Sequence, residues 1–256
     1  MDVDTSTLLL LLLAALTAGW IDAVVGGGGL VQLPALLLVP GISPVQALAT
    51  NKLASIMGTS VSAATFYRRV HPDLRTAGPM ALTAFVGAIG GAALASRIPS
   101  ELFTPIILGV LVLVAVFTIA RPSVGATTQL RWSGNGHLGA AAAIGLVIGA
   151  YDGLLGPGTG TFLVISLVSV LGYAFLPASA IAKIANFATN AGALIFFVPH
   201  GAVIWGLGLA MGAANLTGGY IGARMAVAKG SGFVRGVFVV VVSALILRLG
   251  WQVFAG

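Results

Sequence analysis

The stretch DAVVGGGG occupies residues 22–29, and a related stretch, DGLLGPGTG, occupies residues 152–160. In each stretch a single aspartate lies in apolar sequence, four residues before the glycine-rich run begins. Glycine and proline cost a helix about 1 and about 3 kcal/mol per residue, respectively, so both runs are expected to interrupt a helix. The recurrence of this pattern indicates that the chain consists of two related halves.

Further landmarks recur in the same order in both halves. Asp152 follows Asp22 by 130 residues, and Lys183 follows Lys52 by 131 residues. The other landmarks are Pro44 and Gly90-Gly91 in the first half and Pro177 and Gly218-Gly219 in the second. The sequence therefore predicts an internal duplication, with repeats at residues 1–120 and 137–256 joined by a linker at residues 121–136.

The composition excludes an ordinary soluble domain. Hydrophobic residues make up 58% of the chain and charged residues only 7%, whereas a soluble domain has about 25% charged residues. A chain with so little polar material is expected to use the lipid bilayer as its solvent. The net charge of +6 does not indicate nucleic-acid binding, because the basic residues lie at the ends of apolar runs and form no basic stripe.

Apolar segments long enough to cross a bilayer, about 20 residues each, recur along the chain. They are residues 8–25, 44–66, 77–96, 102–120, 137–155, 177–198, 202–223 and 234–254. Two shorter apolar segments, 30–39 and 161–172, follow the glycine runs, and the sequence leaves open whether they cross fully or re-enter. The predicted fold is an all-α membrane bundle with glycine-broken helices near the midplane.

Three basic segments indicate how the halves are oriented. Residues 67–76, 121–136 and 224–235 carry most of the arginines, and cytoplasmic loops are enriched in lysine and arginine. All three are cytoplasmic if the short segment 161–172 crosses. This favours two inverted repeats of about five segments each and an external N-terminus. A model with eight spans and re-entrant short segments remains the alternative.

Lys52 and Lys183 each lie within an apolar helix, where an ammonium group costs about 2.5–3.5 kcal/mol. Each therefore needs a counter-charge or a wet cavity. One interpretation is a structural ion pair with Asp22 or Asp152, the only acidic residues deep in apolar sequence. The other is a pair of symmetry-related cations that face a bound anion. The two carboxylates can then serve as counter-charges or as proton carriers.

Hydrogen-bonding groups accompany the two lysines. Lys52 shares a helix face with Ser55 and Thr59, and Lys183 shares one with Asn186 and Asn190. A helix that begins after each glycine run would also direct backbone N–H groups at an anion. The predicted substrate-binding set is Lys52, Lys183, Asn51, Ser55, Thr59, Asn186, Asn190, Gln32, Gly28, Gly29, Gly158 and Thr159.

Four segments together resemble the sulfite exporter TauE/SafE family of bacterial membrane transporters. They are DAVVGGGGLVQLPALL (22–37), ALATNKLASIMGTSVSAATFYRR (47–69), DGLLGPGTG (152–160) and AKIANFATNAGAL (182–194). The resemblance covers nearly the whole chain. It implies a duplicated carrier of the bacterial inner membrane that exports small sulfur-containing anions such as sulfite or organosulfonates.

The leading hypothesis is a secondary transporter that works by alternating access, with proton coupling through Asp22 or Asp152 as an additional hypothesis. A passive anion channel is the alternative. An intramembrane aspartyl protease is disfavoured because the Gly-x-Gly-Asp motif of that class is absent. The chain has no cysteine and its three histidines are far apart in sequence. No cofactor, metal or nucleic acid is therefore expected, and the expected partners are a small anion and the bilayer.

Overall fold

A computed structural model of the chain describes residues 4–99 and 127–255. Within these ranges every regular element is a helix, which confirms the predicted all-α architecture. The predicted span at residues 102–120 and the first part of the linker at residues 121–136 lie outside the described residues.

The first half contains α1 (Thr5–Val25), α2 (Gly29–Leu37), α3 (Pro44–Val70) and α4 (Leu74–Ala95). The second half contains α6 (Gly134–Leu154), α7 (Thr159–Ser166) with its π-helical continuation η1 (Leu167–Leu171), α8 (Phe175–Phe197) and α9 (Trp205–Ala255). In order along the chain, α1, α2, α3 and α4 of the first half therefore correspond to α6, α7, α8 and the first part of α9 in the second half, and the second helix is short in both halves.

Local sequence signals place the ends of the helices around the glycine runs. Gly26 adopts a left-handed conformation (φ 85°) that ends α1, and α2 begins at Gly29. Ser43 caps α3 by accepting a hydrogen bond from the backbone N–H of Gln46, and Pro44 occupies the first helical position as predicted. Pro177, by contrast, lies two residues inside the start of α8.

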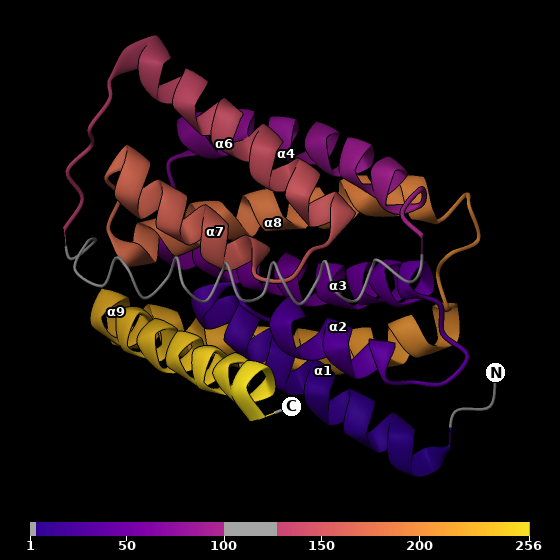
Figure 1. Cartoon of the computed structure of the whole chain (residues 1–256). Helices are drawn as coiled ribbons and strands as arrows, with labels where there is room; N and C mark the ends of the chain where they lie inside the picture. The colour runs from indigo at the N-terminus through magenta and orange to yellow at the C-terminus, as the bar shows by residue number, and fades with distance from the viewer. Residues whose placement is uncertain (1–3, 100–126, 256) are drawn as a thin grey trace.

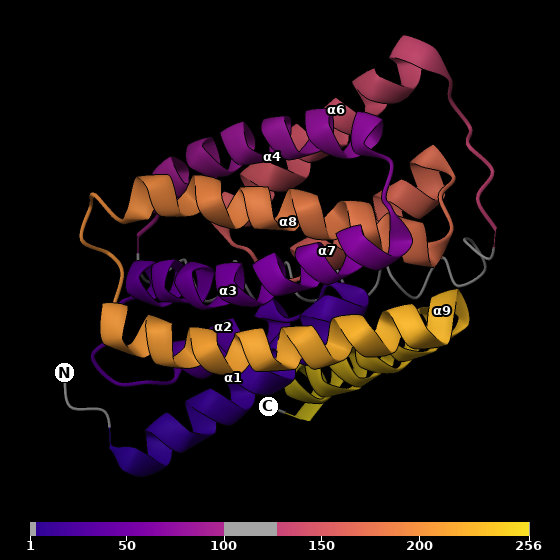
Figure 2. The same cartoon turned by 180° about the vertical axis from the view of Figure 1, so that it is seen from behind.

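The lysine-bearing helices α3 and α8 lie together at the centre of the bundle (Figures 1 and 2). Helices α4 and α6 pack against each other on one side, and α1 and α9 pack against each other on the other side. Helix α8 also packs against α4, and α3 against α9. Each outer layer therefore combines a helix of the first half with a helix of the second half.

Small residues allow the outer helices to approach closely, as the four-residue spacing of Gly87 and Gly91 and of Gly218 and Gly222 predicts. At the contact of α4 with α6, a Cβ built on Gly91 would lie 2.0 Å from the carbonyl oxygen of Ala150. At the contact of α1 with α9, a Cβ built on Gly218 would lie 1.9 Å from the carbonyl oxygen of Leu16. Neither interface has room for a side chain at these positions.

Adjacent glycines of α4 give a matched test of this packing. Gly90→Ala is expected to raise the free energy of unfolding by up to about 1 kcal/mol, because alanine is the better helix former and a Cβ at Gly90 meets no atom within 4 Å. Gly91→Ala is expected to lower it by about 1–3 kcal/mol through overpacking. Thermal unfolding of the two purified variants measures the difference, and equal melting temperatures would contradict the close contact.

Four described helices, α1, α4, α6 and α8, are long and apolar enough to cross a bilayer. Helix α3 has 27 residues but a more polar composition, because its inward face carries Asn51, Lys52 and Ser62. Helix α2 has only nine residues, a length of about 13 Å against about 30 Å for the hydrocarbon core.

The segment at residues 224–235 differs from the predicted loop. It is helical, and within the 51 residues of α9 the helix is interrupted at Gly230, whose backbone angles are not helical (φ 74°, ψ −171°). At this point the chain reverses direction, so the last part of α9 runs back beside its first part (Figures 1 and 2). A single glycine with a positive φ is enough for the turn, since no side chain opposes that conformation.

Candidate functional site

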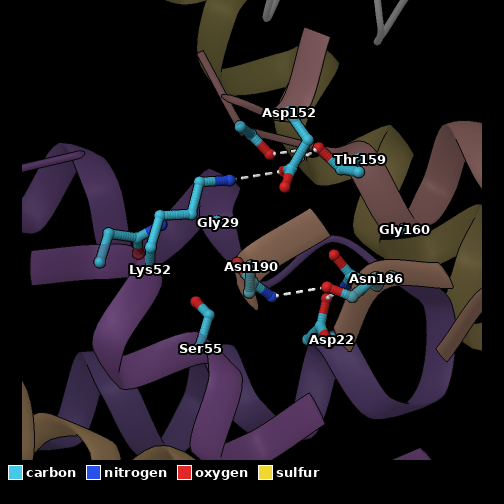
Figure 3. Close-up of a pocket in the computed structure, with 12 residues that line it drawn as sticks. Asp22, Gly29, Lys52, Ser55, Asp152, Thr159, Gly160, Asn186 and Asn190 are labelled. Atoms are coloured by element: carbon cyan, nitrogen blue, oxygen red, sulfur yellow. Dashed lines mark hydrogen bonds and ion pairs between the residues drawn. The ribbon is translucent and has the colours of Figure 1, made fainter. Parts of the chain in front are cut away.

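A small polar cavity lies where the two glycine breaks meet the two lysine-bearing helices (Figure 3). Its volume is about 20 Å³, which is room for roughly one water molecule. Six helices and both breaks contribute to its wall. The lining residues are Asp22, Gly26, Gly29, Asn51, Lys52, Ser55, Asp152, Gly156, Thr159, Gly160, Asn186 and Asn190.

Lys52 of α3 forms an ion pair with Asp152 of α6, with 2.7 Å between Nζ and Oδ1. The two side chains are only 2% and 3% exposed. Thr159, at the start of α7, places its hydroxyl 2.5 Å from the same carboxylate oxygen (Figure 3). The other oxygen, Oδ2, is buried and has no hydrogen-bond partner among the described residues. Only one of the two oxygens of the Asp152 carboxylate therefore has polar partners.

Gly156 makes room for the lysine. A Cβ built at this position would lie 3.0 Å from Nζ of Lys52, and the backbone has a φ of 88°. Both the space and the conformation therefore favour glycine. The second glycine run thus does more than interrupt a helix, because it lets the ammonium group pass close to the backbone.

Lys183 of α8 forms the second ion pair, with Asp22 of α1, and 2.9 Å separates Nζ from Oδ2. Lys183 also donates a hydrogen bond to the main-chain carbonyl of Asp22. Asn186 donates to the remaining carboxylate oxygen at 3.4 Å. Asp22 is 14% exposed, against 3% for Asp152. The second pair is therefore better hydrogen-bonded and more accessible than the first.

Both ion pairs join one half of the chain to the other. Each lysine has an aspartate in its own half, yet Lys52 selects Asp152 and Lys183 selects Asp22. The aspartates lie near the ends of α1 and α6, just before the breaks, and the lysines lie within α3 and α8. Separating either pair would leave a charge buried on each side of the contact between the halves.

The two glycine breaks touch each other beside the ion pairs. A Cβ built on Gly26 would lie 2.1 Å from the carbonyl carbon of Gly160. Thr161 donates its backbone N–H to the carbonyl of Gly26 at 3.0 Å and its hydroxyl to the carbonyl of Val25 at 3.1 Å. The freed backbone of one break is thus partly satisfied by the other, as buried backbone requires.

The predicted site residues fall into two groups. Those that line the cavity are Lys52, Asn51, Ser55, Asn186, Asn190, Gly29, Thr159, Asp22 and Asp152, and Lys183 contacts it through Asp22. Gln32 instead accepts a hydrogen bond from Asn215 of α9 at 2.7 Å. The hydroxyl of Thr59 bonds back to the carbonyls of Ser55 and Ile56.

Two glycines of the predicted substrate-binding set, Gly28 and Gly158, are not among the residues that line the cavity. Gly28 packs against the carbonyl of Ala18 and against Asp22, and Gly158 (φ 79°) precedes α7. The sequence prediction also omitted residues that the structure places at the cavity, namely Gly26, Gly156 and Gly160. Their signal was present, because they belong to the same runs. The contact of Asn215 with Gln32 was harder to predict. Its only sign in the sequence is a single amide side chain within the apolar sequence of α9.

The charges around the cavity cancel, because two lysines face two aspartates. Within the described ranges no three histidine, aspartate or glutamate side chains gather as metal ligands. The side-chain amides of Asn51, Asn186 and Asn190 and the hydroxyls of Ser55 and Thr159 add neutral hydrogen-bonding groups. The arrangement can therefore receive a small charged ligand by exchanging one partner of an existing ion pair.

The chain matches the family model for the sulfite exporter TauE/SafE over residues 11–249. It is 37% identical to a probable membrane transporter protein, ORF9, of Sinorhizobium sp, over 97% of this chain and 94% of that one. It is 33% identical to the probable membrane transporter protein YfcA of Escherichia coli K12, over 93% of this chain and 88% of YfcA. No solved structure gives a significant match. The chain therefore belongs to the sulfite exporter TauE/SafE family.

Proposed function

We propose that the chain is a secondary transporter that moves small sulfur-containing oxyanions, such as sulfite or organosulfonates, by alternating access. The observation that carries this proposal is the crossed pair of buried ion pairs around a polar cavity. The ion pairs and the cavity lining together place two cations and a set of hydrogen-bond donors at the contact between the halves. The family match and the relatives named as probable membrane transporters also support transport.

The cavity suggests how binding is linked to movement. At about 20 Å³ it has room for roughly one water molecule, so a larger oxyanion enters only if the walls separate. The anion then takes the place of a carboxylate at Lys52 or Lys183, and the exchange weakens a tie between the two halves. A ligand that changes the contact between halves shifts the balance between their arrangements, as alternating access requires.

The repeats are proposed to be inverted, with about five segments each. In Figure 1 helix α1 runs in the opposite direction to α6, and α3 in the opposite direction to α8, which supports the inversion. The loop between α3 and α4, the segment before α6 and the turn at Gly230 also lie at one end of the bundle (Figures 1 and 2). Arg68, Arg69, Arg75, Arg131 and Lys229 lie in these segments or in the helix turns that adjoin them. We therefore assign this end to the cytoplasm and the N-terminus to the outside of the bacterial inner membrane.

The carboxylates of Asp22 and Asp152 are proposed to couple transport to protons. In proteoliposomes, sulfite flux is expected to saturate with concentration, and accumulation against a gradient is expected to stop when the proton gradient is collapsed. Flux measured with and without a protonophore tests this. Ohmic, non-saturating conductance would overturn the carrier and favour a passive anion channel. Saturating flux that ignores the proton gradient would contradict the coupling alone.

A ligand screen identifies the substrate class. Sulfite, sulfate, thiosulfate, sulfonates and carboxylates are each added to the purified protein, and thermal unfolding is measured. A ligand present at about 100 times its Kd stabilises the folded state by about 2.7 kcal/mol. We expect sulfur oxyanions to raise the melting temperature and carboxylates to raise it less. Stabilisation by carboxylates alone would contradict the proposed substrate class.

A further inference from the structure

A second cavity, far larger than the first, lies at the end of the bundle where α4 and α6 begin. Its volume is about 860 Å³. Its lining includes the polar residues Arg75, Arg131 and Asn135 and the apolar residues Leu74 and Leu138. None of its lining residues borders the small cavity between the ion pairs. We propose that this cavity, here called the α4–α6 pocket, binds the phosphate group of an anionic membrane lipid.

The two arginines provide the charge. Both are exposed, and neither guanidinium has a hydrogen-bond or ion-pair partner within the described part of the chain. Arginine guanidinium groups bind phosphate through charge-assisted, often bidentate hydrogen bonds. The first backbone N–H groups of α6 add to this, since Ser133 precedes the helix without capping it through its side chain.

Asp73 is the acidic residue of the pocket and its charge is already engaged. One carboxylate oxygen accepts the backbone N–H of Arg75, and the other accepts the hydroxyls of Thr76 and Tyr173. Partial burial opposes its ionisation, but these hydrogen bonds outweigh it and hold the pKa of Asp73 below its usual value. Asp73 therefore remains ionised and the pocket keeps a net positive charge.

His137 provides the second, independent observation. It lines the pocket, it is 7% exposed, and its Nδ1 has no hydrogen-bond partner among the described residues. Its Nε2 lies 2.9 Å from the hydroxyl of Thr76, and that hydroxyl already donates to Asp73. Nε2 must therefore be the donor in this contact, and in the neutral ring Nδ1 is left as an unused acceptor.

A phosphoglycerol headgroup matches both features. Its phosphate would bind the two arginines, and its glycerol would lie beside His137. The Nδ1 atom of His137 is itself buried, so the ring must shift slightly before it accepts a hydrogen bond from a glycerol hydroxyl. The depth of the pocket relative to the bilayer also suits a lipid headgroup. Helices α4 and α6 are both long enough to cross the bilayer, and both begin at the pocket. Trp132, 51% exposed on the pocket wall, is typical of the headgroup region.

Native mass spectrometry of the full chain tests the site with phosphatidylglycerol and phosphatidylcholine. The wild type is expected to retain phosphatidylglycerol but not phosphatidylcholine. The double variant Arg75→Gln/Arg131→Gln is expected to bind phosphatidylglycerol at least about tenfold more weakly, because the phosphate loses its charge-assisted hydrogen bonds to both guanidinium groups. The matched control is Arg68→Gln/Arg69→Gln, which removes two exposed arginines from the same end of the bundle but outside the pocket.

Each outcome decides the proposal. Equal weakening in the two double variants would overturn the site in favour of diffuse attraction to the basic end. Inorganic phosphate that displaces phosphatidylglycerol at equal concentration would overturn the lipid as the ligand. Phosphatidylethanol keeps the singly charged phosphodiester but lacks the headgroup hydroxyls, and it is expected to bind about fivefold more weakly than phosphatidylglycerol. Equal binding of the two lipids would overturn the role of His137. Arg75→Lys/Arg131→Lys keeps the charge, so intermediate binding by this variant supports the site even if the glutamine variant fails to fold.

Discussion

Lys52→Ala is expected to abolish sulfite flux and to lower the free energy of unfolding by about 3–5 kcal/mol, the usual cost of breaking a buried ion pair by removing one partner. Asp152, only 3% exposed, would keep its charge without a cation. Lys183→Ala is also expected to abolish flux but to destabilise less, since Asp22 is 14% exposed and retains the hydrogen bond from Asn186. Flux in proteoliposomes and thermal unfolding measure the two effects separately.

Two further variants separate substrate binding from folding. Lys52→Ala/Asp152→Asn removes both charges, so it is expected to recover much of the lost stability while flux stays absent. Lys229→Ala removes the remaining lysine of the chain, which is exposed at the end of the first part of α9, and is expected to transport normally. Full flux in both Lys52→Ala and Lys183→Ala would exclude a binding role for the two buried lysines.

Gly26→Ala is expected to be the most damaging substitution in the first glycine run. The position needs a left-handed backbone (φ 85°), which costs a residue with a Cβ about 1–2 kcal/mol. The new methyl group would also lie 2.1 Å from the backbone of Gly160, so the two breaks would have to separate. Overpacking of this kind adds about 1–3 kcal/mol. We therefore expect a lower melting temperature and no flux.

The neighbouring glycine supplies the control for that experiment. A Cβ at Gly27 would meet its nearest atom, in the side chain of Leu30, at 3.4 Å, and the residue has no positive φ. Gly27→Ala is therefore expected to fold with a melting temperature close to that of the wild type. If the two variants unfold at the same temperature, the contact between the two breaks does not contribute to stability.

The sequence predicted the parts of this site that follow from one-dimensional patterns. Lys52, Asp152 and the glycine runs stand out because charge and flexible backbone are costly within apolar segments. The selection of partners does not follow from such patterns. Whether Lys52 pairs with Asp22 or Asp152 depends on how α1, α3 and α6 pack, and the spacing along the chain is compatible with both.

The same limit explains the other differences from the sequence prediction. Gln32 was assigned to the substrate as one of the polar residues near the lysines, but its side chain bonds to Asn215, 183 residues later in the chain. Gly90 and Gly91 together form one landmark of the predicted duplication, yet only Gly91 contacts the backbone of α6. Long-range contacts decide these roles, and a single sequence contains no direct record of them.

The crossed ion pairs also have a consequence for how the protein is made. Membrane proteins are inserted from the N-terminus, so Asp22 enters the bilayer long before Lys183, which lies 161 residues later. Until then its carboxylate lacks its final partner, at a cost of about 2.5–3.5 kcal/mol if it lies at the bilayer centre. The first half of the chain alone is thus an incomplete product of synthesis, and its charges reach their final pairing only when the second half docks.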